Sequence, residues 1–525
     1  MTSPRHLRCC WAYLGSAPLK RAELTTGGEY MQKTAYQQHL SPALRVIRGN
    51  ADYRERRLIL ERIDRELMIS GLEKRFVDQR VKLASAQGSL SARRMQNVIK
   101  HAIRALRCAL ARLLLGDDLR GMAVSLAESD LLQWFCRMDE LDAVRVPAKS
   151  TLQRYENMVT PEELKELNIM LIRHVADADG AQKVGLEIPV DLDRFFLDST
   201  CVPANIHFPV DWTLLRDGAG TLLAAIILIR KHGLKHRIME PAALMRRMNL
   251  LCMEMTFARR RTDSAKTRKM ILRKLKQLTK MIRKHGERYH DLLDARWSET
   301  DWTRRQAGQV LKRMRNVLDQ LPKAMRQAHE RIIGERPVAN AEKILSLYEP
   351  DIHVIVRGKA RAEVEFGNTL MLCEQAQGLI VDYELFKQQA PADSRLLPNC
   401  TRQLQKDFAG LLPRGDFKIS VAGDRGYDSG DNQNRLADIK WFNAVASRDP
   451  LRLQRQRKKS RFVKEQTRRA QTEGRIGIIK INFIGDPLPA KGFAGRSLRV
   501  AWAVLAHNLW VIARLPEKQA QEKAA

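Results

Sequence analysis

RFFLDSTCV, at residues 194–202, places a carboxylate inside an apolar, strand-like run. The apolar residues on both sides of Asp198 are typical of a buried strand. A buried, unpaired carboxylate costs several kcal/mol, so Asp198 needs a metal ion, a partner or an exposed strand end. The run therefore predicts a strand of a sheet and marks a candidate site on it.

Two later stretches supply further carboxylates. AGDRGY, at residues 422–427, puts Asp424 at the end of a second strand, and RRAQTEGRIGIIK, at residues 468–480, puts Glu473 on a basic helix. Carboxylate oxygens are the ligands that Mg²⁺ prefers, and a cluster of them can hold two ions about 3.5–4 Å apart for phosphoryl transfer. These acids are therefore candidate metal ligands.

The charge balance indicates a polyanionic partner. The 525 residues include 92 Lys plus Arg against 60 Asp plus Glu, a formal net charge of +32. Such a field speeds association with nucleic acid and releases its counterions. The longest purely apolar run, Leu222–Ile229, is far shorter than a membrane span, and the N-terminus has no secretory pattern. We therefore expect a cytoplasmic protein that binds DNA and no membrane.

The chain is long enough for two or three domains, and its patterns divide it into segments. We expect a poorly ordered leader at 1–50, a helical DNA-binding domain at 51–180, the first part of a catalytic domain at 190–229, a basic helical insert at 230–347, the rest of the catalytic domain at 348–515 and a tail at 516–525.

The helical N-terminal domain contains a possible helix-turn-helix. VPAKSTLQRYENM, at residues 146–158, places a proline before a Ser/Thr pair that can cap a short helix carrying Lys149, Gln153 and Arg154 outward. The apolar segment SDLLQWFCRM, at residues 129–138, precedes it, as the first helix of such a motif would. Lys149 and Arg154 are therefore candidate DNA contacts. An ordinary surface helix in a helical bundle would give the same pattern.

The insert combines charge with amphipathicity. Residues 251–290 hold 13 Lys/Arg against 3 Asp/Glu, a surplus of +10, beside an apolar stripe that includes Leu272, Leu275, Leu278 and Ile282. One face can pack while the other meets phosphates. A solvated face on a coiled-coil arm would read the same way.

The helix with Glu473 also carries cations on the same face. At roughly 100° per residue, Arg469, Glu473 and Lys480 fall within about 60° of one another. One face would then present a carboxylate between two phosphate-binding cations, although a solvated ion pair would look the same locally. Arg475 on this helix and Asn205 after the first strand complete the DNA-binding candidates.

Five segments in order carry a resemblance to a known family. They are LDSTCVPANIHFPVDWTLL, VEFGNTLMLCE, AGDRGYDS, TEGRIGIIK and AWAVLAHNLWVIARL. Together they resemble the DDE transposases of bacterial insertion sequences, in particular the group known as ISNCY. The spacing around Glu473 is similar to the Tyr-x2-Arg-x3-Glu-x6-Lys signature of related transposases, with Arg469 and Lys480 matching and Gln466 standing where the signature has Tyr.

The resemblance implies a fold and a reaction. The fold is α/β, with an RNase H-like mixed sheet flanked by helices, interrupted by the long helical insert and preceded by the all-α DNA-binding region. Asp198, Asp424 and Glu473 would hold two Mg²⁺ ions, or Mn²⁺ as a substitute, for cleavage at insertion-sequence ends and strand transfer into target DNA. The family also implies a homodimer on DNA, associated with the bacterial nucleoid. A metal-dependent nuclease without strand transfer and a catalytically inactive DNA-binding descendant remain alternatives.

Overall fold

The computed structural model describes residues 44–138, 144–258, 260, 262–359 and 362–524. All of these residues belong to one compact unit. Residues 1–43 of the expected leader therefore lie outside the described residues. Among the described residues, the first helix begins at Ala51, where the side chain of Asn50 accepts a hydrogen bond from Tyr53 N and caps it.

The N-terminal region is helical, as its periodicity predicts. Its helices are α1 (Ala51–Ile69), α2 (Leu72–Ser85), α3 (Ala92–Leu115), α4 (Leu119–Glu128), α5 (Asp130–Phe135), α6 (Lys149–Glu156), α7 (Pro161–Ala176) and α8 (Ala178–Lys183). The fully buried Arg107 on α3 joins these helices, because it pairs with Asp64 at 2.6 Å, with Glu73, and with the carbonyl oxygen of Phe135 at 2.9 Å. A buried charge needs such partners.

A mixed sheet forms the centre of the second half, which confirms the predicted α/β class. Its strands are β1 (Arg194–Pro203), β2 (His353–Lys359), β3 (Ala362–Gln375), β4 (Ile380–Leu385), β5 (Ser420–Gly423) and β6 (Phe442–Val445). The order is β2-β3-β1-β5-β6, and β4 also pairs with β3. The two neighbours of β1 run in opposite directions, since β3 is antiparallel to β1 and β5 is parallel to it. Strand β6 continues the parallel half.

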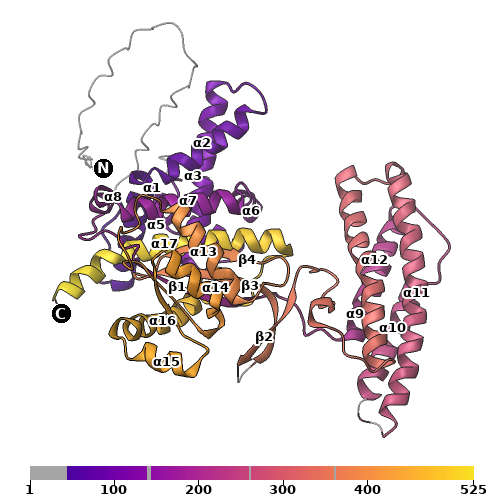
Figure 1. Cartoon of the computed structure of the whole chain (residues 1–525). Coiled ribbons are helices and arrows are strands. Elements are labelled where there is room, and N and C mark those ends of the chain that lie inside the picture. The colour runs from indigo at the N-terminus through magenta and orange to yellow at the C-terminus, as the bar shows by residue number, and fades with distance from the viewer. Residues whose placement is uncertain (1–43, 139–143, 259, 261, 360–361, 525) are drawn as a thin grey trace, which may run out of the picture. The chain divides into compact units, whose positions relative to one another are not determined.

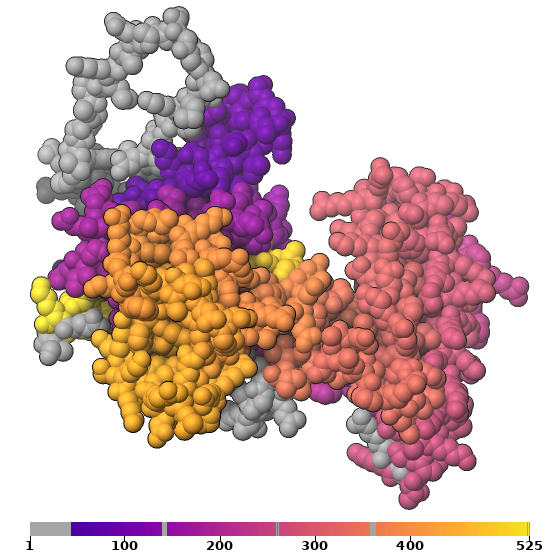
Figure 2. Space-filling model, in the orientation of Figure 1, coloured from indigo at the N-terminus to yellow at the C-terminus, as the bar shows by residue number. Residues whose placement is uncertain are grey.

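Helices flank this sheet, as predicted. They are α13 (Asp393–Asp407), α14 (Gly430–Asp438), α15 (Pro450–Arg457), α16 (Ser460–Ile478) and α17 (Gly492–Ala524), with short turns η3 (Arg425–Tyr427) and η4 (Ile479–Ile484). Figure 2 shows the orange atoms of α13 to α16 as one continuous surface. The residues set aside as a tail, 516–525, continue α17 as far as Ala524.

Helix α17 docks against the edge strand β4. Asn508 accepts from Ile380 N at 2.9 Å and donates to Ile380 O at 2.8 Å, and it also donates to Asn168 on α7 at 2.7 Å. Exposed strand edges invite pairing with other chains, so a covered edge protects the sheet. The amide pair ties the N-terminal helices and the sheet together through α17.

The helical insert is a bundle between β1 and β2 (Figure 1). Its helices are α9 (Asp211–Lys231), α10 (Pro241–Ala258), α11 (Ser264–Arg296) and α12 (Arg304–Ile332). The short turn η1 (Trp297–Glu299) lies between α11 and α12, and η2 (Asn340–Glu342) lies between α12 and β2. The predicted stripe of Leu272, Leu275, Leu278 and Ile282 lies in their common core. Helical structure begins at Asp211 and not at residue 230, because α9 is buried among its neighbours and its continuous apolar run lacks helical periodicity.

Both ends of the insert leave the sheet at one residue. Gly367 on β3 pairs with Pro203, the last residue of β1, and with His353, the first residue of β2. A Cβ at Gly367 would lie 2.1 Å from the carbonyl oxygen of Val202, so only glycine fits this crossing point.

Among the described residues, helices α9 and α17 are long and apolar enough to cross a membrane. In the structure 61% and 72% of their apolar windows are buried, which is typical of core helices.

Helix α16 is fixed to the sheet by one carboxylate. Glu374 on β3 is 3% exposed, and its Oε1 lies 2.7 Å from Arg468 Nη2 and 2.8 Å from Arg475 Nη1. Arg468 also donates to the carbonyl oxygen of Ala376 at 2.8 Å and stacks over Phe196 of β1. These contacts set the position of every side chain on α16.

We expect Glu374→Gln to destabilise the protein by about 3 kcal/mol, because it leaves two arginines beside a buried site without a counter-charge. The urea midpoint followed by circular dichroism measures this, with the exposed Glu342→Gln as the control variant. Equal midpoints for the two variants would show that the ion pairs do not hold α16.

Candidate active site

Asp198 lies on β1, level with Asp424, which follows directly after the neighbouring strand β5. The parallel register pairs Phe195 with Val421 and Phe196 with Ala422. Two residues further along each chain come Asp198 and Asp424. Since neighbouring strands are about 4.8 Å apart, the two carboxylates leave the sheet side by side. The sequence predicted that both acids belong to one site, and the register brings them together.

The surroundings of Asp198 disfavour its charge. Burial raises the pKa of Asp198 to about 6, and the charges of Asp424 and Glu473 act in the same direction. The amide of Ser199, which donates to Asp198 Oδ1 at 2.8 Å, and the cation of Arg469 oppose this shift. All three predicted acids are therefore close enough to interact.

Asp424 is held by the turn that follows β5. Its Oδ1 accepts from Gly426 N at 2.8 Å and caps the turn η3. A Cβ at Gly426 would lie 2.9 Å from Asp424 Oδ1 and 2.8 Å from Oδ2 of Asp393. A side chain at residue 426 would therefore displace these carboxylates, and Asp393, at the start of α13, is a fourth carboxylate beside the site. Sequence reasoning missed Asp393, which reads as an ordinary acid in the first turn of a helix.

Tyr427 is a second residue that sequence reasoning missed. Its ring is fully buried, and within the described chain its hydroxyl has no hydrogen-bond partner. Burial raises its pKa, and so do the charges of Asp393, Asp198 and Asp424. The phenol therefore lies among the carboxylates. The only signal in the sequence was its place in AGDRGY.

Glu473 stands at the rim of the site. Its side chain is 67% exposed, and its Oε1 lies 3.8 Å from Arg469 Nη1. Gln466 holds Arg469 in place, because Arg469 Nε donates a hydrogen bond to Gln466 Oε1 at 3.1 Å. Gln466 in turn donates to the carbonyl oxygens of Gly423 at 3.1 Å and Ala444 at 2.5 Å. The residue that stands where the signature has Tyr thus ties α16 to β5, the strand that ends just before Asp424.

Two predicted DNA contacts on this helix have other partners. Lys480 lies beyond α16, in the π-helical turn η4, with its Nζ 4.0 Å from Asp486 and its side chain 14% exposed. The change of helix type breaks the ideal spacing that placed Lys480 on the face of Glu473. Arg475 pairs with Glu374 and packs over Gly378, where a Cβ would meet Arg475 Nη1 at 1.6 Å. This contact gives Arg475 a structural role.

Asn205 lies away from the carboxylates. It is exposed and lines a separate cavity of about 250 Å³ together with His207 and Tyr348. A strand rises about 3.3 Å per residue, so the end of β1 at Pro203 is about 17 Å from Asp198. The structure does not bring Asn205 to the candidate active site.

The candidate recognition helix exists but differs from the prediction. Lys149 and Arg154 on α6 are exposed, as expected. The helix begins at Lys149 with Ala148 as N-cap, so the Ser/Thr pair lies inside it. It packs mainly on α3 and α4, whereas the motif predicted packing against the segment that forms α5.

The three acids are of the right chemical type to bind a divalent cation, but their side chains do not converge on one point. Within the described ranges, no three His, Cys, Asp or Glu side chains converge as a ready metal site. The oxygen donors are the kind that Mg²⁺ selects. Burial, and to a smaller extent the charges of Asp424 and Glu473, raise the pKa of Asp198, and a bound cation would offset both effects. Glu473 must leave Arg469 to join them.

Comparison with protein-family models, with curated proteins and with solved structures gives no match.

We expect Asp198→Asn to stabilise the metal-free protein at pH 8 by roughly 1–3 kcal/mol, because the folded state then no longer carries a buried charge. The raised pKa means that Asp198 contributes most stability below its ordinary pKa and loses it as pH rises through about 6. The gain should therefore fade as pH falls to 4.

Thermal unfolding in EDTA at pH 4, 6 and 8 measures the effect, and the exposed Asp438→Asn is the control. A lower or unchanged midpoint for Asp198→Asn at pH 8 would contradict the assignment.

Proposed function

We propose that this chain is a DDE transposase that cleaves DNA at insertion-sequence ends and joins them to target DNA. The observation that carries the proposal is the placement of Asp198 and Asp424 at the same level of a mixed sheet, with Glu473 and Arg469 beside them on α16. Three acids far apart in sequence thus lie near enough for Asp424 and Glu473 to act on Asp198.

The strand arrangement supports an RNase H-like fold. Strands β4, β3 and β1 form an antiparallel half, and β5 and β6 extend β1 in parallel. The acids sit on the first strand, after β5 and on a helix that covers the sheet. This arrangement agrees with the fold that the sequence resemblance implies, interrupted between β1 and β2 by the helical insert.

The residues of the chain have separate tasks in this proposal. Asp198, Asp424 and Glu473 would hold two Mg²⁺ ions, or Mn²⁺, which supply activation of the attacking oxygen and stabilise the leaving oxygen. Arg469 faces the carboxylates and can position the scissile phosphate. Gln466 and Glu374 position α16 and touch no substrate.

DNA is the partner that the charge favours. A net charge of +32 suits both the transposon ends and the target duplex. Two ends must be brought together for transposition, so a homodimer on DNA in the bacterial cytoplasm, at the nucleoid, is part of the proposal.

We expect Asp198→Asn, Asp424→Asn and Glu473→Gln each to lower strand cleavage by about 10³-fold, several kcal/mol of transition-state stabilisation, while DNA affinity changes little. The substrate is a duplex with the inverted repeats that flank the reading frame, supplied with Mg²⁺, and Asp438→Asn is the control.

Cleavage at the wild-type rate by any of the three variants would remove that residue from the site. Joining of a 3′-hydroxyl end to a second duplex separates the transposase from a nuclease. If the wild-type protein binds DNA but shows no cleavage, the result would favour a catalytically inactive DNA-binding descendant.

The insert offers a second DNA surface. The stripe of α11 packs inward, and the cations Arg273, Lys274, Lys280 and Lys284 are exposed on the same helix. If about six phosphates are contacted there, affinity falls by about 10³ between 50 and 200 mM salt.

Replacing Arg273, Lys274, Lys280 and Lys284 together by Gln should flatten the salt dependence of DNA affinity by about 0.9 in slope per lost phosphate contact. Fluorescence anisotropy against salt concentration measures the slope. The matched control exchanges Arg and Lys at the same positions and keeps the charge. Equal slopes for the neutralised and control proteins would show that this face is only solvated.

A further inference from the structure

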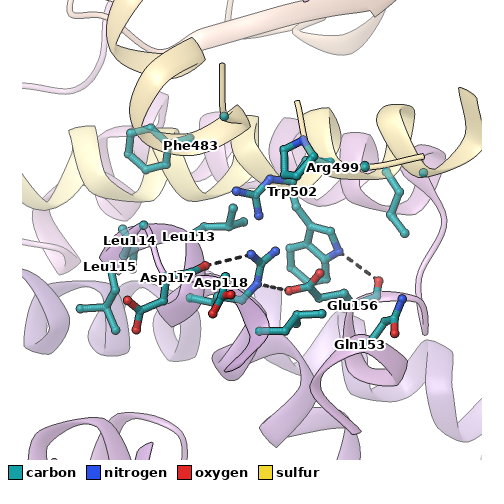
Figure 3. A pocket seen from close by; sticks show the side chains of 18 of the residues that line it. Leu113, Leu114, Leu115, Asp117, Asp118, Gln153, Glu156, Phe483, Arg499 and Trp502 are labelled. Atoms are coloured by element: carbon teal, nitrogen blue, oxygen red, sulfur yellow. Dashed lines mark hydrogen bonds and ion pairs between the residues drawn. The ribbon is translucent and has the colours of Figure 1, made fainter. Parts of the chain in front are cut away.

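A cavity of about 1180 Å³ lies between α3, α6, η4 and α17, apart from the carboxylates. Its lining includes Arg112, Lys149, Glu156, Arg499 and Trp510. A typical small-ligand site has about 300–1,000 Å³, so the cavity has room for a nucleotide but not for a duplex. Figure 3 shows Arg499 reaching into it from α17 toward the side that carries Glu156.

The inner end of the cavity holds two guanidinium groups and one carboxylate. Arg112 pairs with Glu156 and donates to the carbonyl oxygen of Asp117 at 3.1 Å. Arg499 Nε donates to the carbonyl oxygen of Ile484 at 3.1 Å, while its Nη1 is buried and has no hydrogen-bond partner in the part of the chain described. The two cations therefore share the single negative charge of Glu156, which also acts on Arg499.

The other acids of the cavity are already engaged. Asp118 accepts from Arg120 N at 3.0 Å and Gly121 N at 2.6 Å, which caps α4. Asp117 Oδ2 accepts from Ser125 Oγ at 2.8 Å. Neither carboxylate is directed to Arg499 by these bonds.

An unmatched buried cation is costly. Burial, together with neighbouring Arg112, lowers the pKa of Arg499 to about 9. At neutral pH the guanidinium still carries its charge, and a buried charge without a partner costs several kcal/mol. A bound anion would remove this cost, and guanidinium groups match phosphate oxygens in geometry.

The walls and rim suit the rest of a nucleotide. Apolar side chains, among them Leu113, Leu115, Phe483 and Leu498, line the cavity beside the arginines. A base can lie on such a wall while its phosphate meets the cations. Lys149 on the exposed face of α6 stands at the rim, so the candidate recognition helix borders the same cavity.

We propose that this cavity binds one unpaired nucleotide of a DNA strand, with its phosphate on Arg499 and Arg112 and its base on the apolar wall. The inference rests on the proposed function, because it takes the strand to be DNA. It adds a strand-holding site that is separate from the cleavage site.

The test uses the full chain in EDTA, so that no cleavage occurs. Fluorescence anisotropy measures binding of a short single-stranded oligonucleotide and of a blunt duplex of the same sequence, and inorganic phosphate serves as competitor. We expect Arg499→Gln to weaken single-strand binding by about tenfold, as loss of a charge-assisted hydrogen bond does, and to change duplex binding little. The exposed Arg402→Gln is the matched control.

A second variant keeps the test independent of folding. Glu156→Gln leaves Arg112 and Arg499 both without a counter-charge, so it should tighten single-strand binding while lowering the thermal midpoint. Arg499→Gln should do the reverse and keep or raise the midpoint, since it removes an unmatched buried charge. Phosphate should compete for the wild type and not for Arg499→Gln.

Each outcome is decisive. Single-strand binding by Arg499→Gln at wild-type strength would overturn the inference, and so would an equal loss for strand and duplex, which would make Arg499 a general cation. Absence of any DNA binding by the wild type would instead remove the proposed function. Wild-type binding to both DNAs with unchanged Arg499→Gln binding removes the cavity proposal alone.

Discussion

The candidate site depends on a buried ion-pair cluster that no acid of the site takes part in. Glu374 accepts from Arg468 and Arg475, and Arg468 lies over Phe196 one strand away. These contacts hold α16 at a fixed height over the sheet. Gln466 adds a second tie, to the end of β5. Because Arg469 and Glu473 follow on the same helix, their distance from Asp198 and Asp424 is set by residues with no chemistry of their own.

At two places in the structure, charged groups of the same sign lie close together and are buried. At the carboxylates, burial and the neighbouring negative charges raise the pKa of Asp198. In the cavity, burial and the neighbouring Arg112 lower the pKa of Arg499. Each cluster is unfavourable in the protein alone. Each becomes favourable with a ligand of opposite sign, a cation in the first case and a phosphate in the second.

The sequence predicted the sheet and the acids better than the helices around them. Asp198 and Asp424 could be predicted from the sequence because a carboxylate inside or at the end of an apolar strand conflicts with burial. The start of the insert could not be predicted, because α9 is apolar on nearly all sides and its sequence has no helical period. Asp393 and Tyr427 are invisible to local patterns, since only the fold brings α13 and the turn after β5 together. Lys480 was misplaced because a π-helical turn shifts the angle that an α-helix would give.

The strand pairings at Gly367 place the two ends of the helical insert close together. Pro203 and His353 face this single residue from opposite sides, so the insert enters and leaves the sheet about two strand spacings, or about 10 Å, apart. A bundle with adjacent ends and its own core can be gained or lost as a module without changing any strand pairing. A change in the length or charge of the insert would therefore leave the strand pairings intact, whereas a change of register between β1 and β5 would separate Asp198 from Asp424.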